Sequence, residues 1–284
     1  MNGHKTSFRL DRFLTLHLFR VLMRPDREKA AILMYHSISD VHENGQSYFR
    51  TVTSLSVFSE QMQFLDESGY NVVDLMTLVQ AVKAGRDLPP RSVALTFDDG
   101  FRDFYTDAFP VLQRHDFPAT VFLVTGRIDR DAPLNGKSCL TWGQVRELDR
   151  AGITFGSHTV NHPTLSVLSE KDLEFELIHS KERIESELGK SIDSFCYPFG
   201  FPEHDRPFLG KLFAILASND YKCCLTTRIG TAAAGDDPFR LRRLPVNSMD
   251  DSPLLEAKMA GAYDWLQTCQ TVYKRFVPPQ VKVI

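Results

Sequence analysis

The 284-residue sequence lacks the features that would place it in several specialised classes of protein. It has five cysteines, an odd number without a Cys-x-x-Cys pair, which indicates reduced, mostly buried thiols rather than a disulfide framework. Residues 8–23 are apolar, but arginines interrupt them, and they fall short of the roughly 20 residues that a membrane-spanning helix needs. The formal net charge of -3 gives no general attraction to nucleic acid, so we expect no nucleic-acid partner.

The amino-terminal residues also do not match the pattern of a cleavable export signal. Arg20 and Arg24 interrupt the apolar segment, and no small-residue cleavage site follows closely. We therefore expect a cytoplasmic protein. The adjacent Cys223 and Cys224 lie in an apolar run and predict a plain strand.

The amino-terminal segment, residues 1–29, predicts an amphipathic basic helical extension. It carries seven Lys/Arg against three Asp/Glu. A helix over residues 8–23 would gather its large apolar side chains on one face and turn its arginines toward the other; the apolar set is Leu10, Phe13, Leu14, Leu18, Val21 and Leu22. Such a helix either contacts the inner face of a membrane peripherally or packs on the rest of the chain or on a partner subunit.

Residues 30–284 predict one α/β domain in which strands and helices alternate, the pattern of parallel strands joined by crossover helices. Capping patterns at Thr141 and Ser169 predict helix starts ahead of two amphipathic segments. The expected strands lie at residues 31–36, 71–73, 93–97, 119–124, 153–155, 194–197, 222–226 and 240–244.

Two adjacent carboxylates, Asp98 and Asp99, end the apolar run Val93–Phe97. Neighbouring carboxylates repel each other unless water, a shared proton or a cation relieves the repulsion. Asp-Asp-Gly after a strand is also ordinary turn chemistry. The dipeptide by itself therefore leaves a turn and a metal site open.

A pair of histidines, His158 and His162, follows the strand-like run 153–155. Histidines four residues apart can project to one side of a helical turn and share one ion. Together with the two carboxylates, this pair favours a metal site at the carboxyl ends of parallel strands, where barrel enzymes place their active sites.

These motifs resemble those of the polysaccharide deacetylases that share the NodB homology domain, also called carbohydrate esterase family 4. Thr-Phe-Asp-Asp-Gly stands at Thr96–Gly100, and His-Ser/Thr-x-x-His stands at His158–His162. The third motif, Arg-x-Pro-Tyr/Phe, falls on Cys196–Phe199, where a cysteine replaces the arginine. The resemblance implies an irregular (β/α) barrel of about seven parallel strands.

The resemblance also implies a mechanism. Asp99, His158 and His162 would bind a divalent ion, with Zn²⁺ favoured and Co²⁺, Ni²⁺ or Mn²⁺ as alternatives. Asp98 would be the general base, and the backbone N–H of Phe199 would help to stabilise the oxyanion.

Two parts of the family pattern are missing. No histidine follows His204, so the late histidine that serves as general acid in most of the family has no counterpart. His36, at the end of the first strand, matches the acid of the branch related to poly-N-acetylglucosamine deacetylases; a plain loop or core histidine is the alternative. Arg242 or Arg243 would replace the arginine missing at Cys196.

The sequence therefore predicts a metal-dependent hydrolase that removes the N-acetyl group from an amino sugar in a glycan or glycoconjugate. An O-acetyl esterase or an N-deformylase would use the same residues. An inactive glycan-binding homologue and a non-haem iron oxygenase, which also uses two histidines and a carboxylate, are the other classes considered. The oligomeric state and the substrate glycan stay open.

Overall fold

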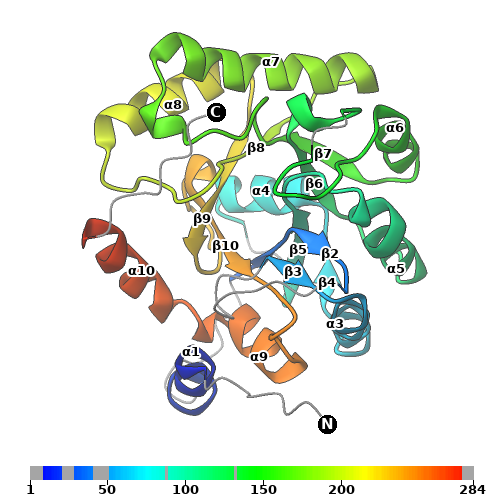
Figure 1. Cartoon of the computed structure of the whole chain (residues 1–284). Helices are drawn as coiled ribbons and strands as arrows, with labels where there is room; N and C mark the ends of the chain where they lie inside the picture. The colour runs from blue at the N-terminus through cyan, green and yellow to red at the C-terminus, as the bar shows by residue number, and fades with distance from the viewer. Residues whose placement is uncertain (1–8, 21–28, 41–50, 87–88, 131–132, 277–284) are drawn as a thin grey trace.

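A closed barrel of parallel strands forms the centre of the computed structural model, which describes residues 9–20, 29–40, 51–86, 89–130 and 133–276 (Figure 1). The seven strands follow the order β1-β10-β9-β8-β7-β6-β5, and pairing of β1 with β5 closes the ring. This confirms the predicted (β/α) barrel. The barrel strands are β1 (Ala31–Tyr35), β5 (Ser92–Phe97), β6 (Thr120–Leu123), β7 (Thr154–Ser157), β8 (Ser194–Cys196), β9 (Cys223–Ile229) and β10 (Leu241–Pro245).

Three shorter strands lie outside the ring. β4 (Asn71–Val72) pairs with the beginning of β5, while β2 (Ser37–Ile38) and β3 (Val52–Thr53) form a separate two-stranded sheet. Cys223 and Cys224 are buried in β9, as the apolar run predicted.

Helices surround the ring of strands (Figure 1). Both predicted helix starts are confirmed: Thr141 and Gln144 form a reciprocal capping box, and the Ser169 side chain accepts a hydrogen bond from the Asp172 N–H. The helices are α3 (Leu55–Glu67), α4 (Leu75–Ala84), η3 (Phe104–Ala108), α5 (Phe109–Arg114), η4 (Thr125–Arg127), α6 (Trp142–Arg150), η5 (Leu165–Val167), α7 (Glu170–Leu188), α8 (Arg206–Ser218), η6 (Pro238–Arg240), α9 (Ser252–Ala257), η7 (Lys258–Ala262) and α10 (Trp265–Phe276).

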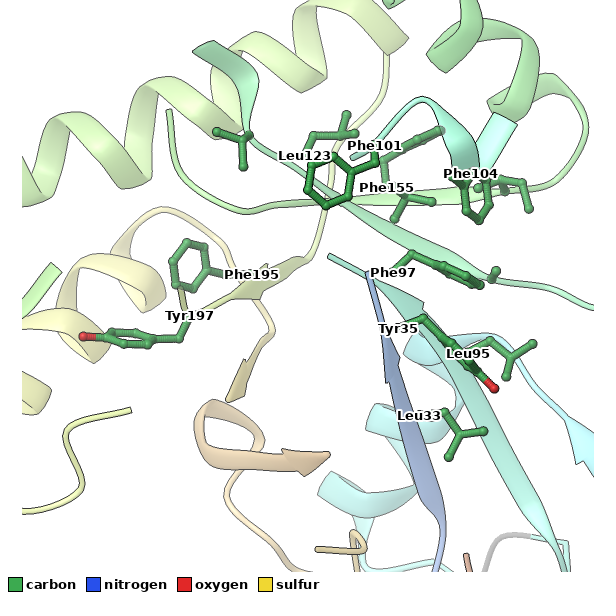
Figure 2. Packing of buried hydrophobic residues seen from close by; sticks show 14 of the residues in the cluster. Leu33, Tyr35, Leu95, Phe97, Phe101, Phe104, Leu123, Phe155, Phe195 and Tyr197 are labelled. Carbon is green, nitrogen blue, oxygen red and sulfur yellow. The ribbon is translucent and has the colours of Figure 1, made fainter. Parts of the chain in front are cut away.

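Alternation along the strands divides the core into two clusters, because successive strand residues point to opposite faces of the sheet. Ile32 and Ala94 belong to one cluster, which also contains the apolar side chains of α4. Their neighbours Leu33 and Leu95 belong to the other, which packs under the outer helices. Figure 2 shows Leu33, Tyr35, Leu95 and Phe97 of β1 and β5 in this outer cluster.

The amino-terminal helix packs on the carboxyl-terminal part of the chain. It consists of α1 (Leu10–Leu14), which continues into η1 (Thr15–Phe19); Val21, Leu22 and the remainder of the predicted helix lie outside the described residues. The Phe19 ring stacks on Trp265 of α10, with ring centroids 4.9 Å apart. Of the two alternatives for this segment, packing on the rest of the chain is therefore observed.

The orientation of this helix is unusual for an amphipathic helix. Its arginines bond to acidic side chains of the domain: Arg9 to Asp250, Arg12 to Asp251 and Arg20 to Glu256. Leu10, Phe13 and Leu18 remain exposed, at 59%, 48% and 44% of their surface. Within the described residues, no helix is both long enough and apolar enough to cross a bilayer.

Candidate metal centre and active site

Three potential metal ligands converge at the carboxyl ends of β5 and β7. Asp99 lies two residues after β5, and His158 follows β7 directly. The Asp99 Oδ1 atom lies 3.6 Å from His158 Nε2 and 3.3 Å from His162 Nε2, and the two Nε2 atoms are 3.2 Å apart. The structure thus brings together the three side chains that the family motifs indicate as ligands.

These separations fit a divalent ion of zinc type. Ligand atoms about 2.0–2.1 Å from an ion, at tetrahedral angles, lie about 3.3–3.4 Å from one another. Two imidazoles and one carboxylate are also the donor set of catalytic zinc sites, which keep a position open for water.

A hydrogen bond at one ring nitrogen of His158 orients the other ring nitrogen for binding a cation. Its Nδ1 lies 2.7 Å from the Cys196 carbonyl oxygen, so a neutral ring donates its proton there and leaves the Nε2 lone pair facing Asp99 and His162. Burial lowers the pKa of His158 to about 4, so the ring is neutral at physiological pH.

The histidine pair does not lie on a helical turn, and that prediction is wrong. Residues 158–162 form an irregular loop in which Thr159 and His162 have left-handed φ values of 72° and 60°. Asp99 and Phe199 also have positive φ values, 71° and 56°. Such conformations are costly for non-glycine residues and tend to occur at functional sites.

A buried carboxylate on α7 holds the histidine loop in this conformation. Glu176 accepts hydrogen bonds from the backbone N–H groups of Val160 and Asn161, at 2.8 and 2.9 Å, and from the Asn161 side chain at 2.8 Å. On the other side of the loop, the Gly126 N–H donates to the Val160 carbonyl oxygen. A Cβ atom on residue 126 would lie only 2.6 Å from that oxygen, so this close approach requires glycine. Sequence reasoning missed Glu176; its signal was a charged residue at a core position of α7.

Asp98 forms a buried ion pair with Arg243, and one of its carboxylate oxygens lies within 4.8 Å of a His158 ring nitrogen. Two parallel hydrogen bonds of 2.7 Å join Arg243 Nη1 and Nη2 to the two Asp98 oxygens. Burial alone would raise the pKa of Asp98, but the Arg243 charge and its hydrogen bonds outweigh that effect and hold the pKa well below its usual range. Asp98 is therefore ionised throughout the physiological range.

Arg243 of β10 thus orients Asp98 from a different strand than the family motif implied. Its Nη2 also lies 3.0 Å from the Cys196 sulfur, at the position where the motif would place the arginine. Arg242 instead bonds to Asp236 and Gln267, away from Asp98. Of the two arginines considered from the sequence, only Arg243 meets Asp98.

His36 and Phe199 complete the rim. His36 follows β1, and its Nε2 lies 3.9 Å from Asp98 Oδ2, with 21% of the side chain exposed. The Phe199 ring packs edge-on against His162, with centroids 4.4 Å apart, and the Phe199 carbonyl accepts a hydrogen bond from Thr227. All six residues selected from the sequence therefore surround one site.

Comparison with known proteins shows a family to which part of this chain is similar. Residues 85–212 match the sequence model described as polysaccharide deacetylase. This segment, which is just under half of the chain, is similar to the polysaccharide deacetylase family. Over 235 residues it is 28% identical to YxkH of Bacillus subtilis, covering 83% of this chain and 76% of YxkH.

Two further relatives are informative. The chain is 34% identical over 139 residues to an Escherichia coli protein named poly-beta-1,6-N-acetyl-D-glucosamine N-deacetylase; the match covers 45% of this chain but only 20% of that protein. The Streptococcus pyogenes deacetylase PplD, solved in complex with acetate, superposes with a TM-score of 0.71 at 28% identity over 81% of this chain and 98% of PplD.

Proposed function

We propose that this protein is a metal-dependent hydrolase that removes N-acetyl groups from an amino sugar in a glycan or glycoconjugate. The observation that carries the proposal is the placement of three ligand atoms 3.2–3.6 Å apart beside a separate, arginine-bound carboxylate. Asp99, His158 and His162 would hold a divalent ion, which would supply Lewis-acid chemistry by polarising a carbonyl and lowering the pKa of a water from 15.7 to about 7.

The chain's own residues then move the protons. Asp98 accepts the proton of the attacking water, whose oxygen forms the new bond to the acetyl carbon. Arg243 keeps Asp98 oriented and ionised until that transfer. His36 donates a proton to the sugar nitrogen as the carbon–nitrogen bond breaks, so acetate and a free amine leave. The Phe199 backbone N–H donates to the developing oxyanion.

The relatives support the substrate class that we propose. The E. coli protein is named for a β-1,6-linked N-acetylglucosamine polymer, and the PplD structure contains acetate, the expected product. Since this chain spans only 20% of the E. coli protein, N-acetylglucosamine in a glycan is part of our proposal rather than a transfer of that name.

An O-acetyl esterase or an N-deformylase would use the same geometry and differ only in the products. The zinc-loaded protein should release acetate and free amine in equal amounts from N-acetylglucosamine oligosaccharides, and Asp98→Asn should reduce the release of both by about 10²- to 10⁴-fold. Formate in place of acetate, or acetate without amine, would show one of the alternative reactions. Oxygen consumption with an iron-loaded protein would instead indicate an oxygenase.

A further inference from the structure

Glu176 of α7 is a buried carboxylate that binds neutral N–H groups rather than a cation. It is 3% exposed, and it accepts hydrogen bonds from the backbone N–H groups of Val160 and Asn161 and from the Asn161 side chain. In the part of the chain that the structure describes, no lysine, arginine or histidine forms an ion pair with it. Glutamate is almost never this buried unless it is paired. The negative charge of Glu176 is therefore available to a cation that the described chain does not supply.

The two backbone N–H groups that Glu176 binds belong to the loop that carries the histidine ligands. They lie between Thr159 and His162, which have left-handed φ values of 72° and 60°. A hollow of about 600 Å³ lies beside this loop, with Val160 in its wall, so side-chain packing supports the loop incompletely there. The hydrogen bonds to Glu176 therefore offset part of the cost of the strained backbone, and they fix the residue that precedes His162.

The charges of the candidate metal centre show what a further carboxylate would do. A divalent ion brings two positive charges, and imidazole ligands bind it in their neutral form. Asp99 contributes one negative charge to the ligand set, whereas Asp98 is neutralised by Arg243 through two hydrogen bonds of 2.7 Å. One positive charge of the ion remains. Glu176 supplies the second negative charge from behind the histidine loop, and its burial limits screening by water and salt.

We propose that Glu176 is a positioning residue that sets the affinity of Asp99, His158 and His162 for a divalent ion. Its hydrogen bonds hold the loop so that His162 Nε2 lies 3.3 Å from Asp99 Oδ1, and its charge balances the second positive charge of the ion. Glu176 acts through the loop and is not itself a ligand. This inference rests on the metal site of the proposed function, but its test needs no substrate.

Zinc dissociation constants, measured by competition with a chelator, test the proposal. Glu176→Gln keeps an oxygen that accepts from both backbone N–H groups but removes the charge, so the dissociation constant should rise about 10-fold. Glu176→Ala also removes the hydrogen bonds and should raise it about 100-fold. Glu182→Gln is the matched control, because Glu182 lies on the same helix but is exposed and contacts His179 rather than the loop. Its zinc affinity should equal that of wild type.

The absorption spectrum of the Co²⁺-loaded protein separates charge from geometry, because it responds to the arrangement of the ligands. Glu176→Gln should keep the wild-type spectrum while binding Co²⁺ more weakly, whereas Glu176→Ala should change the spectrum. A role in folding alone would lower the melting temperature of the metal-free variants and leave the metal affinity of folded protein unchanged. That result, or equal zinc affinity of Glu176→Gln and wild type, overturns the proposal. If Glu176→Ala does not fold, Glu176→Gln decides.

These outcomes are distinct from failure of the proposed function. Zinc binding by wild type without release of acetate from any substrate would overturn the deacetylase proposal and leave the comparison of Glu176→Gln with wild type intact. Wild type that binds no divalent ion would overturn both proposals.

Discussion

Two regions of this protein bury ionised side chains, and they differ in which groups face one another. The junction cluster, between the amino-terminal helix and the carboxyl-terminal helices, consists of Arg9, Asp11, Asp250, Lys258 and Tyr263. Lys258 Nζ donates to Asp250 and to the Pro245 carbonyl, Arg9 bonds to both aspartates, and the Tyr263 hydroxyl donates to Asp11. Each charge in this cluster meets an opposite charge or a polar partner supplied by the chain.

The site cluster consists of Asp98, Asp99, His158, His162 and Arg243. Its Asp98–Arg243 pair is as complete as the junction, but Asp99 Oδ1 and the two imidazole Nε2 atoms converge on one another. With neutral rings, at least the Asp99 oxygen and the His158 nitrogen are acceptors that face each other. The comparison teaches that complete pairing indicates a structural role, whereas converging acceptors indicate a place for a cation.

Removing a converging acceptor should have the largest effect. Asp99→Asn removes the anionic ligand, so metal affinity should fall by more than the 10- to 100-fold typical of losing an outer-shell partner, and activity should fall with it. Elemental analysis measures the metal content and should find about one zinc per wild-type chain. Excess metal should restore part of the activity of Asp99→Asn. Full activity of wild type after exhaustive chelation would contradict the metal mechanism.

The Asp98–Arg243 pair of the site cluster should respond differently to substitution. Asp98→Asn should reduce acetate release by about 10²- to 10⁴-fold while metal is retained, because the side chain no longer accepts a proton. It also leaves the Arg243 charge buried without its partner, so the free energy of unfolding should fall by about 3–5 kcal/mol. Denaturant titration and metal analysis separate the two effects.

Variants of neighbouring residues sharpen this prediction. Arg242→Gln, on the same strand as Arg243, should keep near-normal rates because Arg242 does not contact Asp98. His36→Ala should resemble Asp98→Asn, with metal retained. Our assignment of the two aspartates is wrong if Asp98→Asn, rather than Asp99→Asn, loses the metal.

Breaking the junction cluster should affect stability alone. Lys258→Met removes one of the two cations that pair with the buried Asp250, while Arg9 remains, so the free energy of unfolding should fall by about 1.5–3 kcal/mol, with kcat/KM of the folded protein unchanged. Lys211→Met is the matched control: its bridge to Glu170 is exposed, and its loss should leave the free energy of unfolding nearly unchanged. A fall in kcat/KM of folded Lys258→Met would show that the junction also supports the site.

The smallest expected effect concerns membrane binding by the exposed face of the amino-terminal helix. We propose that Leu10, Phe13 and Leu18 insert into a membrane surface, each contributing about 1 kcal/mol. Because Arg9, Arg12 and Arg20 are already paired with acidic residues, binding should be similar for neutral and anionic vesicles.

Vesicle co-sedimentation tests this proposal. Replacing Leu10, Phe13 and Leu18 together by serine should abolish co-sedimentation and leave activity on a soluble substrate intact. Phe175→Ser, on α7 at the opposite end of the view in Figure 1, is the control for an exposed apolar residue elsewhere. Sedimentation that the triple variant does not change would leave the helix as a packing element only.

Local sequence patterns predicted most of the fold because they act over short distances. Apolar runs fixed the strands to within a few residues, and the capping box at Thr141 and Gln144 marked the start of α6. The conformation of the loop from His158 to His162 was not predictable from spacing, since it depends on Glu176 of α7 and Gly126 of η4.

The sequence by itself determined which chemical groups end the strands, and parallel strands bring such ends to one rim. Asp98, Asp99, His158 and His36 could therefore be assigned to a common site. Only the tertiary structure decided that Arg243 rather than Arg242 meets Asp98, because neighbouring strand residues point to opposite faces and the sequence does not say which face is inward. It also decided that the amino-terminal helix turns its arginines inward, since their acidic partners lie more than 230 residues away along the chain.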